Sequence, residues 1–310
     1  MTTALVTGAG GFVARHLAPA LRRHGVTSLV GADAQAARPD GFDAWHVADL
    51  MDAPATRRVV KIAQPSLVLH LVGRFRGSDA EVRESNVTTA ANLLDAVRAD
   101  AEAARVVLVG SAAEYGAVPA AHQPVRETFE GAPTGAYGRA KREVSALGAR
   151  AVRERGMHVV VARPFNVVGA GIPDTLVAGA IVGRLRAALA GPPLRKIRIG
   201  STDSVRDFVD VQDVAEGLAL AAKLGRPGES YNLCSGEGHR IADLLERLLA
   251  LAGEPIAVEH DAKLVRAAEV DRLVGDRSKA RDELGWRPSV ALSESLRAAW
   301  ESSAPECAAP

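Results

Sequence analysis

The sequence predicts an α/β protein built on a Rossmann-type, doubly wound parallel sheet, with a smaller C-terminal α/β lobe. Two observations carry this prediction. Short, almost wholly apolar runs alternate with helical patterns over residues 1–165, and strands that are buried on both faces of a parallel sheet show such runs. A glycine-rich stretch, TGAGGF, follows the first apolar run and opens the first helical pattern, so the chain turns sharply there from strand to helix.

The elements of the first half follow this alternation. Each expected strand is short and apolar, and each expected helix repeats its apolar residues at helical spacing. We expect strands at 3–8, 27–33, 46–50, 66–73, 105–111 and 158–164, and helices at 11–25, 54–64, 87–99 and 136–156.

The pattern changes after Pro164, because glycine and proline interrupt residues 166–174 and predict a loop. Beyond this loop we expect helices at 176–191, 211–225 and 241–253, strands at 194–200 and 228–236, and a frayed tail at 302–310. We therefore expect a first domain over residues 1–165, rejoined by parts of 205–235, and a lobe formed mainly by residues 166–310.

Composition narrows the class of protein. The chain has 310 residues and a net charge of +1, with 47% hydrophobic and 24% charged residues, which is ordinary for a globular domain and gives no field to gather nucleic acid or a membrane. Cys234 and Cys307 are too few for a disulfide framework and form no metal cluster, and Cys234 is expected to be buried in YNLCSG. No signal-peptide pattern and no apolar run of ~20 residues occur, so a cytoplasmic protein is expected.

The glycine-rich turn is a candidate nucleotide site. Gly8, Gly11 and Ala14 follow one another at intervals of three residues. Gly8 allows the tight turn, Gly11 lets a phosphate approach the backbone, and a small residue at position 14 lets the helix pack on the strand. The N–H groups at the start of the helix then face a diphosphate. The pattern thus predicts a dinucleotide site.

Two acids refine this prediction. Asp33 ends the second strand, where a carboxylate accepts hydrogen bonds from a ribose diol and repels a 2′-phosphate. NAD(H) is therefore favoured, with NADP(H) as the alternative because Arg38 lies within reach on a loop. Asp49 follows the third strand and suits an adenine amino group; its alternative role is the cap of the next helix.

The stretch YGRAK carries the candidate catalytic groups. Tyr137 and Lys141 stand four residues apart in an expected helix, so their side chains share one face. Ser111 ends the preceding strand, at the edge of the sheet where open α/β sheets bind ligands. Lys141 is expected to lower the pKa of the Tyr137 phenol and to hold a nicotinamide ribose. Ser111 would bind the substrate oxygen whose proton Tyr137 moves.

With these motifs in order, the chain resembles the extended short-chain dehydrogenases/reductases of the nucleotide-sugar epimerase/dehydratase family. The matching stretches run almost end to end and are TGAGGF, ADL, LHLVG, SAAEYG, AYGRAK, RPFNVVG and RDFVDVQDV. The resemblance implies NAD(H) or NADP(H) as cofactor and a nucleotide-diphosphate sugar as substrate. It also implies a homodimer through a four-helix interface that includes the Tyr137 helix.

The resemblance also implies the roles of individual residues. Ser111, Tyr137 and Lys141 match the catalytic triad, and Asn86 matches the asparagine that supports the lysine through water, with a helix N-cap as its alternative role. The residues implied to line the cofactor are Gly8, Gly11, Phe12, Val13, Asp33, Asp49, Leu50, Leu71, Val72, Gly73, Tyr137, Lys141 and Pro164.

The residues implied to contact the substrate are Ser111, Ala112, Asn166, Arg206, Arg266 and Glu269. Arg206 matches the arginine on the diphosphate, a task that suits a guanidinium fork. Arg266 and Glu269 match the pair that grips the diphosphate and the nucleoside ribose; a surface ion pair is their alternative role.

The residues after Ser111 bear on the reaction. Sugar 4,6-dehydratases place one or two acids there, whereas this chain has Ala112 and Ala113, which cannot move a proton. Glu114 is expected to point elsewhere. The second half is similar to GDP-4-keto-6-deoxy-D-mannose reductases, which implies reduction of a C4 ketone. The alternatives are a 4-epimerase that retains NAD⁺, for which the departure FNVVGAG leaves room, and a non-catalytic dinucleotide sensor, against which the complete triad argues.

Overall fold

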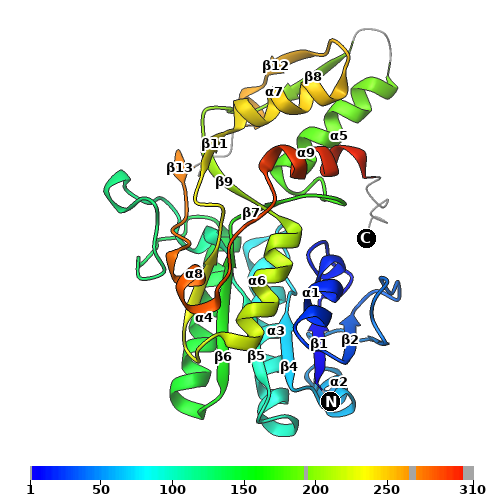
Figure 1. The fold of residues 1–310 in the computed structure, drawn as a ribbon, viewed down its shortest axis with the longest axis vertical. Coiled ribbons are helices and arrows are strands. Elements are labelled where there is room, and N and C mark those ends of the chain that lie inside the picture. The colour runs from blue at the N-terminus through cyan, green and yellow to red at the C-terminus, as the bar shows by residue number, and fades with distance from the viewer. Residues whose placement is uncertain (1, 192–194, 265–269, 303–310) are drawn as a thin grey trace.

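A sheet of seven parallel strands forms the larger part of the molecule (Figure 1). The computed structural model describes residues 2–191, 195–264 and 270–302. The strand order is β10-β6-β5-β4-β1-β2-β3, with β1 (Thr3–Thr7), β2 (Ser28–Asp33), β3 (Ala44–Val47), β4 (Leu67–His70), β5 (Arg105–Val109), β6 (His158–Pro164) and β10 (Ser230–Leu233). The winding reverses between β1 and β4, and open α/β sheets bind ligands at the carboxyl ends of such strands.

Helices cover both faces of this sheet, which confirms the predicted doubly wound α/β fold. One face carries α1 (Leu17–Arg23), α6 (Val211–Leu224) and α8 (Ser278–Leu284), and the other carries α2 (Ala53–Ala63), α3 (Asp79–Asp100) and α4 (Ala136–Arg155). A separate apolar cluster fills the space under each helical layer. Leu17, Leu218 and Trp286 belong to the first cluster, and Leu93 and Val144 belong to the second. Burial on both faces explains why the strands read as apolar runs.

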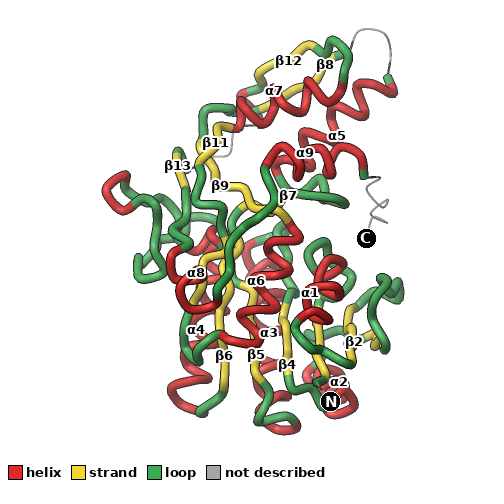
Figure 2. The backbone as a smooth tube through the Cα atoms, in the orientation of Figure 1, coloured by secondary structure: helices red, strands yellow, loops and turns green. Residues whose placement is uncertain are grey.

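The smaller lobe lies beyond the carboxyl ends of the strands (Figure 2). Its helices are α5 (Val177–Ala190), α7 (Ile241–Ala252) and α9 (Leu292–Glu301), and β8 (Lys196–Ile199) pairs with β12 (Ala257–His260). A small mixed sheet joins the lobe to the main sheet and contains β7 (Asn166–Val168), β9 (Val205–Asp210), β11 (Gly238–Arg240) and β13 (Arg272–Leu273). The chain thus leaves the main sheet after β6 and returns to it through α6 and β10.

The loop predicted over residues 166–174 is wrong at its start, because Asn166–Val168 form β7 against Phe208–Asp210 of β9. Two valines in this stretch find a partner strand about 40 residues later, which a local pattern of glycine and proline does not reveal. Gly169 follows at φ +144° and ends the strand.

Several predicted boundaries also differ. The helix expected at 11–25 begins as a 3-10 turn over Ala14–His16 and becomes α-helical only at Leu17, since Pro19 has no N–H to donate to the turn before it. The helix α3 starts at Asp79 instead of 87, because Ser78 and Glu81 form a capping box. The strand expected at 46–50 lies at Ala44–Val47.

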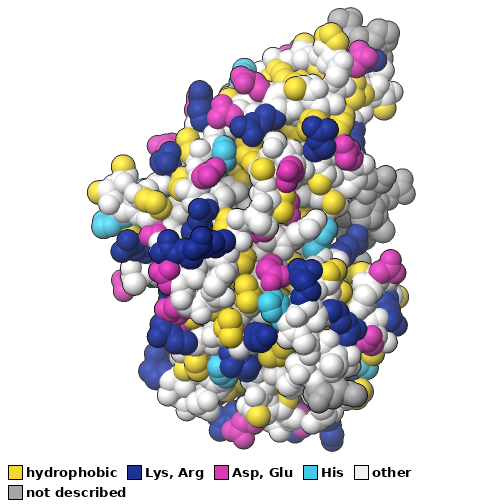
Figure 3. All heavy atoms as spheres, viewed as in Figure 1, with side chains coloured by type: hydrophobic (Ala, Val, Ile, Leu, Met, Phe, Trp, Pro, Cys, Tyr) yellow, Lys and Arg dark blue, Asp and Glu magenta, His cyan; other side chains and the backbone are white. Residues whose placement is uncertain are grey.

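The surface and the charge distribution agree with the small net charge. Basic and acidic side chains are interspersed over the face shown in Figure 3. Cys234 is fully buried as a free thiol, as predicted, whereas Cys307 lies outside the described residues. Among the described helices none is long and apolar enough to cross a membrane, and the described residues contain no group of three or more His, Cys, Asp or Glu side chains arranged to hold a metal ion.

Candidate functional site

The glycine-rich turn lies at the point where the sheet reverses, packed against the end of β4. Gly8 has φ +70°, a conformation that side chains rarely adopt. A Cβ on Gly8 would also lie 2.8 Å from the Val72 nitrogen, and one on Gly11 would lie 3.1 Å from the Gly8 carbonyl oxygen. The turns after β1 and β4 therefore approach each other at backbone distance.

The residues beside this turn pack outward from it. Phe12 packs against the core of the lobe, while Val13 and Leu71 pack against the cluster under α1 and α6. Ala14 is fully buried where the 3-10 turn meets the sheet. The predicted cofactor-lining residues 12, 13 and 71–73 thus lie on the two neighbouring turns after β1 and β4.

Asp33 ends β2, as predicted, and its carboxylate faces the glycine-rich turn. One oxygen accepts from the Gly10 nitrogen at 2.9 Å and the other from the Gln35 nitrogen at 3.0 Å. The side chain is half-buried, whereas Arg38 is exposed on the following loop. Each carboxylate oxygen keeps lone pairs that a ribose diol can use.

Asp49 is exposed and accepts a hydrogen bond from the Met51 nitrogen at 2.9 Å. Its alternative role as the cap of the next helix is wrong, since Asp52 holds the N-cap position of α2. The neighbouring Leu50 is buried, and its carbonyl accepts from Asn92 of α3. The turn after β3 is therefore held by α3.

Ser111 and Tyr137 meet at the carboxyl end of β5. Ser111 caps a 3-10 turn over Ala112–Glu114, and its hydroxyl accepts from the Ala113 nitrogen at 3.1 Å. Tyr137 lies in the first turn of α4, and a side-chain hydrogen bond joins it to Ser111. The helix comes this close because Gly138 has no side chain: a Cβ there would lie 2.5 Å from the Ala113 carbonyl oxygen.

Lys141 points from α4 to the ends of β4 and β5. Its side chain is buried, and Nζ donates to the Val72 carbonyl at 3.1 Å and to the Val109 carbonyl at 2.9 Å. An ammonium has three protons, so these two carbonyls leave one to donate. A Cβ on Gly73 would lie 3.2 Å from Lys141 Nζ and 3.4 Å from Asn86 Oδ1. Gly73 therefore lies beside both groups.

Asn86 Oδ1 is a buried polar atom without a partner among the described residues. The amide nitrogen of Asn86 donates to the Arg74 and Val82 carbonyls, within α3 and its preceding loop. Asn86 lies inside α3, so its alternative role as an N-cap is wrong; Ser78 is the cap. A buried acceptor beside Lys141 indicates a place for a small donor such as water.

Burial shifts the protonation of these groups. It lowers the pKa of Lys141 to about 8, although the charge of Glu114 acts in the opposite direction. Burial raises the pKa of the Tyr137 phenol above its ordinary value, and the hydrogen bond from Ser111 offsets this only in part. The expectation that Lys141 lowers the pKa of the phenol is therefore wrong, because loss of solvent dominates. Burial also lowers the pKa of His70 to about 3, so His70 is neutral.

Comparison with known proteins places this site in a family. Residues 4–234 match the model of the NAD dependent epimerase/dehydratase family. The chain belongs to this family. A GDP-6-deoxy-D-mannose reductase of Pseudomonas aeruginosa is 30% identical over 307 residues, 96% of each chain.

Solved structures of the family agree over nearly the whole chain. RMD from Pseudomonas aeruginosa, complexed with NADPH, superposes with a TM-score of 0.81 at 27% identity, covering 97% of this chain and 98% of that one. A UDP-glucose-4-epimerase from Stenotrophomonas maltophila with bound NAD and formylated UDP-arabinopyranose superposes with a TM-score of 0.84 at 25% identity, covering 97% of each chain.

This chain is accordingly an NAD(P)-dependent enzyme, and its site fits that cofactor. The close-packed turns after β1 and β4, the Asp33 carboxylate, and the buried acceptor of Asn86 beside the third Lys141 proton all suit a polar dinucleotide with two riboses. The Val72 and Val109 carbonyls hold the Lys141 ammonium at the carboxyl edge of the sheet, where open α/β sheets bind ligands.

Of the predicted substrate residues, Ser111 and Ala112 lie on the turn after β5, Asn166 and Arg206 lie on the side of the lobe, and two fall outside the described residues. Asn166 starts β7 and donates to the Asp207 carbonyl at 2.8 Å, and Arg206 lies half-buried on β9, with its guanidinium bonded to the Val205 carbonyl at 3.0 Å. Ala112 and Pro164 are buried where the main sheet meets the lobe. Arg266 and Glu269 belong to the segment that is not described.

Sequence reasoning missed two features beside the triad. Phe75, half-exposed, lies with its ring centroid 4.4 Å from that of Tyr137. Glu114 is buried and forms an ion pair with Arg163 at 3.0 Å. The partners are 49 residues apart in the sequence, so no local pattern joins them.

Proposed function

We propose that this enzyme uses NAD(P)H, with NADH favoured, to reduce the C4 ketone of a nucleotide-linked 4-keto-6-deoxyhexose similar to GDP-4-keto-6-deoxymannose. The carrying observation is the site at the end of β5: Ser111, Tyr137 and Lys141 converge there, and the two residues after Ser111 are alanines. A proton donor is therefore present, while the acids that an elimination of water requires are absent. The similarity to the Pseudomonas aeruginosa reductase supports the same reaction.

In this proposal each residue of the triad acts on one atom. When bound, a nicotinamide would supply the hydride that C4 receives. Ser111 holds the ketone oxygen by a hydrogen bond, and Tyr137 gives its phenolic proton to that oxygen as the negative charge develops. Lys141 remains on the Val72 and Val109 carbonyls and turns its third proton to the cofactor ribose. The raised pKa of the phenol keeps Tyr137 protonated until negative charge develops on the ketone oxygen.

We assign substrate binding mainly to residues of the lobe. Asn166 and Arg206 would contact the diphosphate or the sugar, Ala112 would line the sugar site, and Arg266 with Glu269 would hold the diphosphate and the nucleoside ribose. Residues 1–165, rejoined by parts of 205–235, would form the dinucleotide domain, and residues 166–310 mainly the sugar lobe. A homodimer through α3 and α4 is part of the proposal; these helices lie together on one face of the sheet.

The dinucleotide content of the purified protein tests this proposal. A reductase must exchange its cofactor in every cycle, so denatured protein should release well under one equivalent of dinucleotide. Addition of a GDP-linked 4-keto-6-deoxyhexose should then oxidise NAD(P)H in a one-to-one ratio. The reductase proposal would be rejected if the protein retained one equivalent of NAD⁺ and oxidised no added NAD(P)H.

A 4-epimerase is the second candidate, and the loop after β6 favours it. The stretch FNVVGAG, which includes β7, differs from the FNHTGPG common in the reductases that the chain resembles, and in this second proposal the difference turns the sugar against Tyr137. An epimerase would use the same triad twice, first to oxidise C4 and then to reduce it from the other face. It would interconvert two nucleotide hexoses without net consumption of cofactor.

A further inference from the structure

A buried carboxylate connects the turn that carries Ser111 to the helix that carries Tyr137 and Lys141. Glu114 is 3% exposed. Its Oε1 accepts from the Ser111 backbone nitrogen at 2.8 Å, and its Oε2 accepts from the Ser145 hydroxyl at 2.7 Å. Arg163 of β6 donates to the same Oε2 at 3.0 Å. Three different elements thus meet at one side chain.

The backbone is shaped around this carboxylate. A Cβ on Gly110 would lie 2.3 Å from Glu114 Oε1, so only glycine lets the carboxylate reach the Ser111 nitrogen. Taking both charges of an ion pair out of water is expensive, and apolar residues of the same volume often serve stability equally well. A buried pair at this point therefore calls for a role other than stability.

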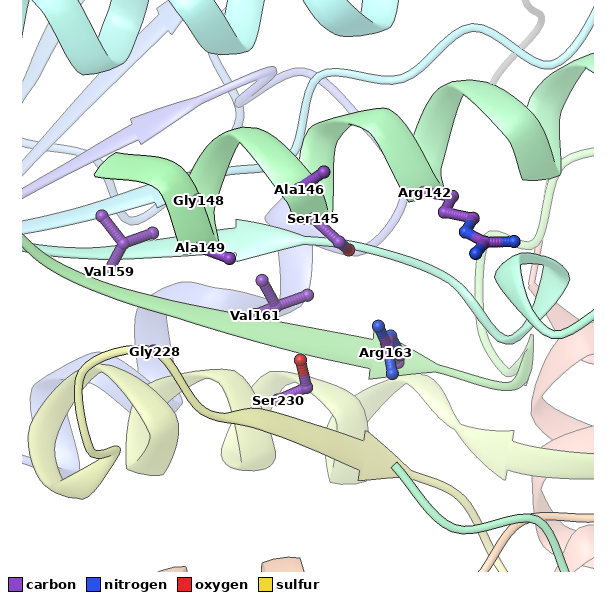
Figure 4. Close-up of a pocket in the computed structure, with 10 residues that line it drawn as sticks. All are labelled: Arg142, Ser145, Ala146, Gly148, Ala149, Val159, Val161, Arg163, Gly228 and Ser230. Carbon is purple, nitrogen blue, oxygen red and sulfur yellow. The ribbon is translucent and has the colours of Figure 1, made fainter. Parts of the chain in front are cut away.

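Ser145 connects the Glu114 carboxylate to the helix α4. Ser145 follows Lys141 by four residues and Tyr137 by eight, so it lies on the same face of α4. Figure 4 shows Ser145 of α4 and Arg163 of β6 extending into the space between helix and strand, near Ser230 of β10. A pocket of about 240 Å³ lies there. The carboxylate thus bridges the Ser111 backbone and the helix of the other two groups.

We propose that Glu114 is a positioning residue for the reduction: it holds the Ser111 hydroxyl in register with Tyr137 and Lys141, and Arg163 is its counter-ion. The inference rests on the proposed function only in taking these three residues as the catalytic groups. Glu114 itself touches neither substrate nor cofactor in this account, because its two oxygens are occupied by protein donors on the side of the turn that faces α4 and β6.

Several charged and titratable groups lie near Glu114 and Arg163, and they determine the effect of a substitution at Glu114. On β6 and the turn, Arg163 also donates to the Tyr115 hydroxyl at 3.2 Å, and a second hollow of about 380 Å³ beside it is lined by Glu127, Glu130 and Arg142. On the side of the site, the charge of Glu114 raises the pKa values of both Tyr137 and Lys141. His70, the other titratable group near Lys141, is neutral.

Glu114→Gln is the first test, because it keeps the shape and removes the charge. We expect kcat to fall roughly tenfold to 100-fold, as for a misplaced catalytic group, with little change in KM. The alkaline limb of the pH profile should move to lower pH, since the pKa of Lys141 loses the contribution of Glu114. In a Ser111→Ala background the same change should cost less than about threefold, because the group it positions is gone. Asp213→Asn, at a buried acid of α6 bonded to Ser289 and Val290, controls for loss of a buried charge.

Equal losses in kcat for Glu114→Gln and Asp213→Asn, or an unmoved alkaline limb, would overturn the proposal and leave Glu114 as a stabilising residue only. A full, multiplicative loss in the Ser111→Ala background would also overturn it.

Ser145→Ala is the second test, because it removes the helix end of the link and leaves both charges in place. We expect kcat to fall several-fold without movement of the alkaline limb. Ser230→Ala makes the same change in the same pocket without a contact to Glu114, and should not alter kcat. Equal effects of the two changes would contradict the link.

A measurement without substrate separates this proposal from the choice of reaction. In Glu114→Ala/Arg163→Met the pair is removed together, so no charge is left unpaired, and the Ser111 amide proton should exchange with solvent at least about tenfold faster than in the wild type. Unchanged exchange would overturn the positioning role, whatever reaction the enzyme catalyses. Faster exchange would support it even if no reductase activity were found.

Discussion

At the scale of single residues, the site depends on a buried ammonium held by two carbonyls. Lys141 donates to the Val72 carbonyl on the turn after β4 and to the Val109 carbonyl at the end of β5, so it joins a turn that lies beside the glycine-rich turn to the strand that precedes Ser111. The spacing of Tyr137 and Lys141, and the place of Ser111 at the end of an apolar strand, could be read from the sequence because helical and strand periodicities fix them locally. The direction of the shift in the Tyr137 pKa could not, because burial depends on neighbours from the whole fold.

Tyr137→Phe removes only the phenolic hydroxyl, which makes it the sharpest change at the site. We expect turnover to fall at least about 100-fold, the scale of a lost general acid, while cofactor binding measured by calorimetry is retained. Tyr231→Phe is the control, since that hydroxyl bonds to Glu283 on the far side of β10. Activity within a few-fold of wild type for Tyr137→Phe would refute the assignment.

The pH dependence should report Lys141. Its pKa is about 8 in the free protein, so the ammonium is present at neutral pH and is lost as the pH rises through about 8. The raised pKa of Tyr137 keeps the phenol protonated over that range, so the phenol does not set the limb. We therefore expect kcat/KM, which reports the free enzyme, to fall above about pH 8. Lys223→Met, at an exposed lysine of α6, should leave this limb unchanged; a flat profile up to about pH 9 would contradict the account.

Asp33 should set the cofactor preference. Its carboxylate faces the glycine-rich turn, where it would bind the ribose diol of NADH and repel the 2′-phosphate of NADPH. Asp33→Asn keeps an acceptor for the Gly10 nitrogen and removes the charge, so the ratio of kcat/KM for NADH to that for NADPH should fall. A wild-type enzyme that strongly prefers NADPH would show that the acid is misread and that Arg38 governs the choice.

At the scale of elements, the contact between α4 and the turn after β5 decides whether the triad forms. Gly138 lies against the Ala113 carbonyl without room for a side chain. The periodicity of residues 136–156 predicted this helix well. Periodicity did not predict the strand β9, because Arg206 and Asp207 interrupt the apolar pattern of that strand. Asp207 is buried there only because Ser235, Gly236 and Gly275, from distant parts of the chain, donate to its carboxylate.

Gly138→Ala should therefore push α4 away from the turn. We expect a loss of about 1–3 kcal/mol in the free energy of unfolding, as for overpacking, together with a larger relative loss of kcat than of cofactor affinity. Gly183→Ala is the matched control: it lies inside α5, a Cβ there meets nothing within 4 Å, and the change should stabilise the protein by up to about 1 kcal/mol. Denaturant unfolding and steady-state kinetics of both variants decide the point, and equal stability of the two would contradict the packing argument.

At the scale of the whole molecule, one chain builds both sides of the site by leaving the main sheet and returning to it. The parallel sheet and the presence of a second lobe followed from the alternation of runs and helices. The pairing of β7 with β9 did not, because it joins segments about 40 residues apart in the sequence. The same topology places the lobe elements that carry the predicted substrate residues Asn166 and Arg206 beyond the carboxyl end of β5, the strand that precedes Ser111.

The fate of the hydride tests the central claim most directly. The enzyme would be supplied with NAD(P)H deuterated at the transferred position and a GDP-linked 4-keto-6-deoxyhexose, and the product would be examined by NMR. We predict one deuterium at C4 of the sugar for each cofactor oxidised. Interconversion of two nucleotide hexoses with no deuterium at C4, no net oxidation of cofactor and one equivalent of retained NAD⁺ would contradict the reductase and establish the epimerase.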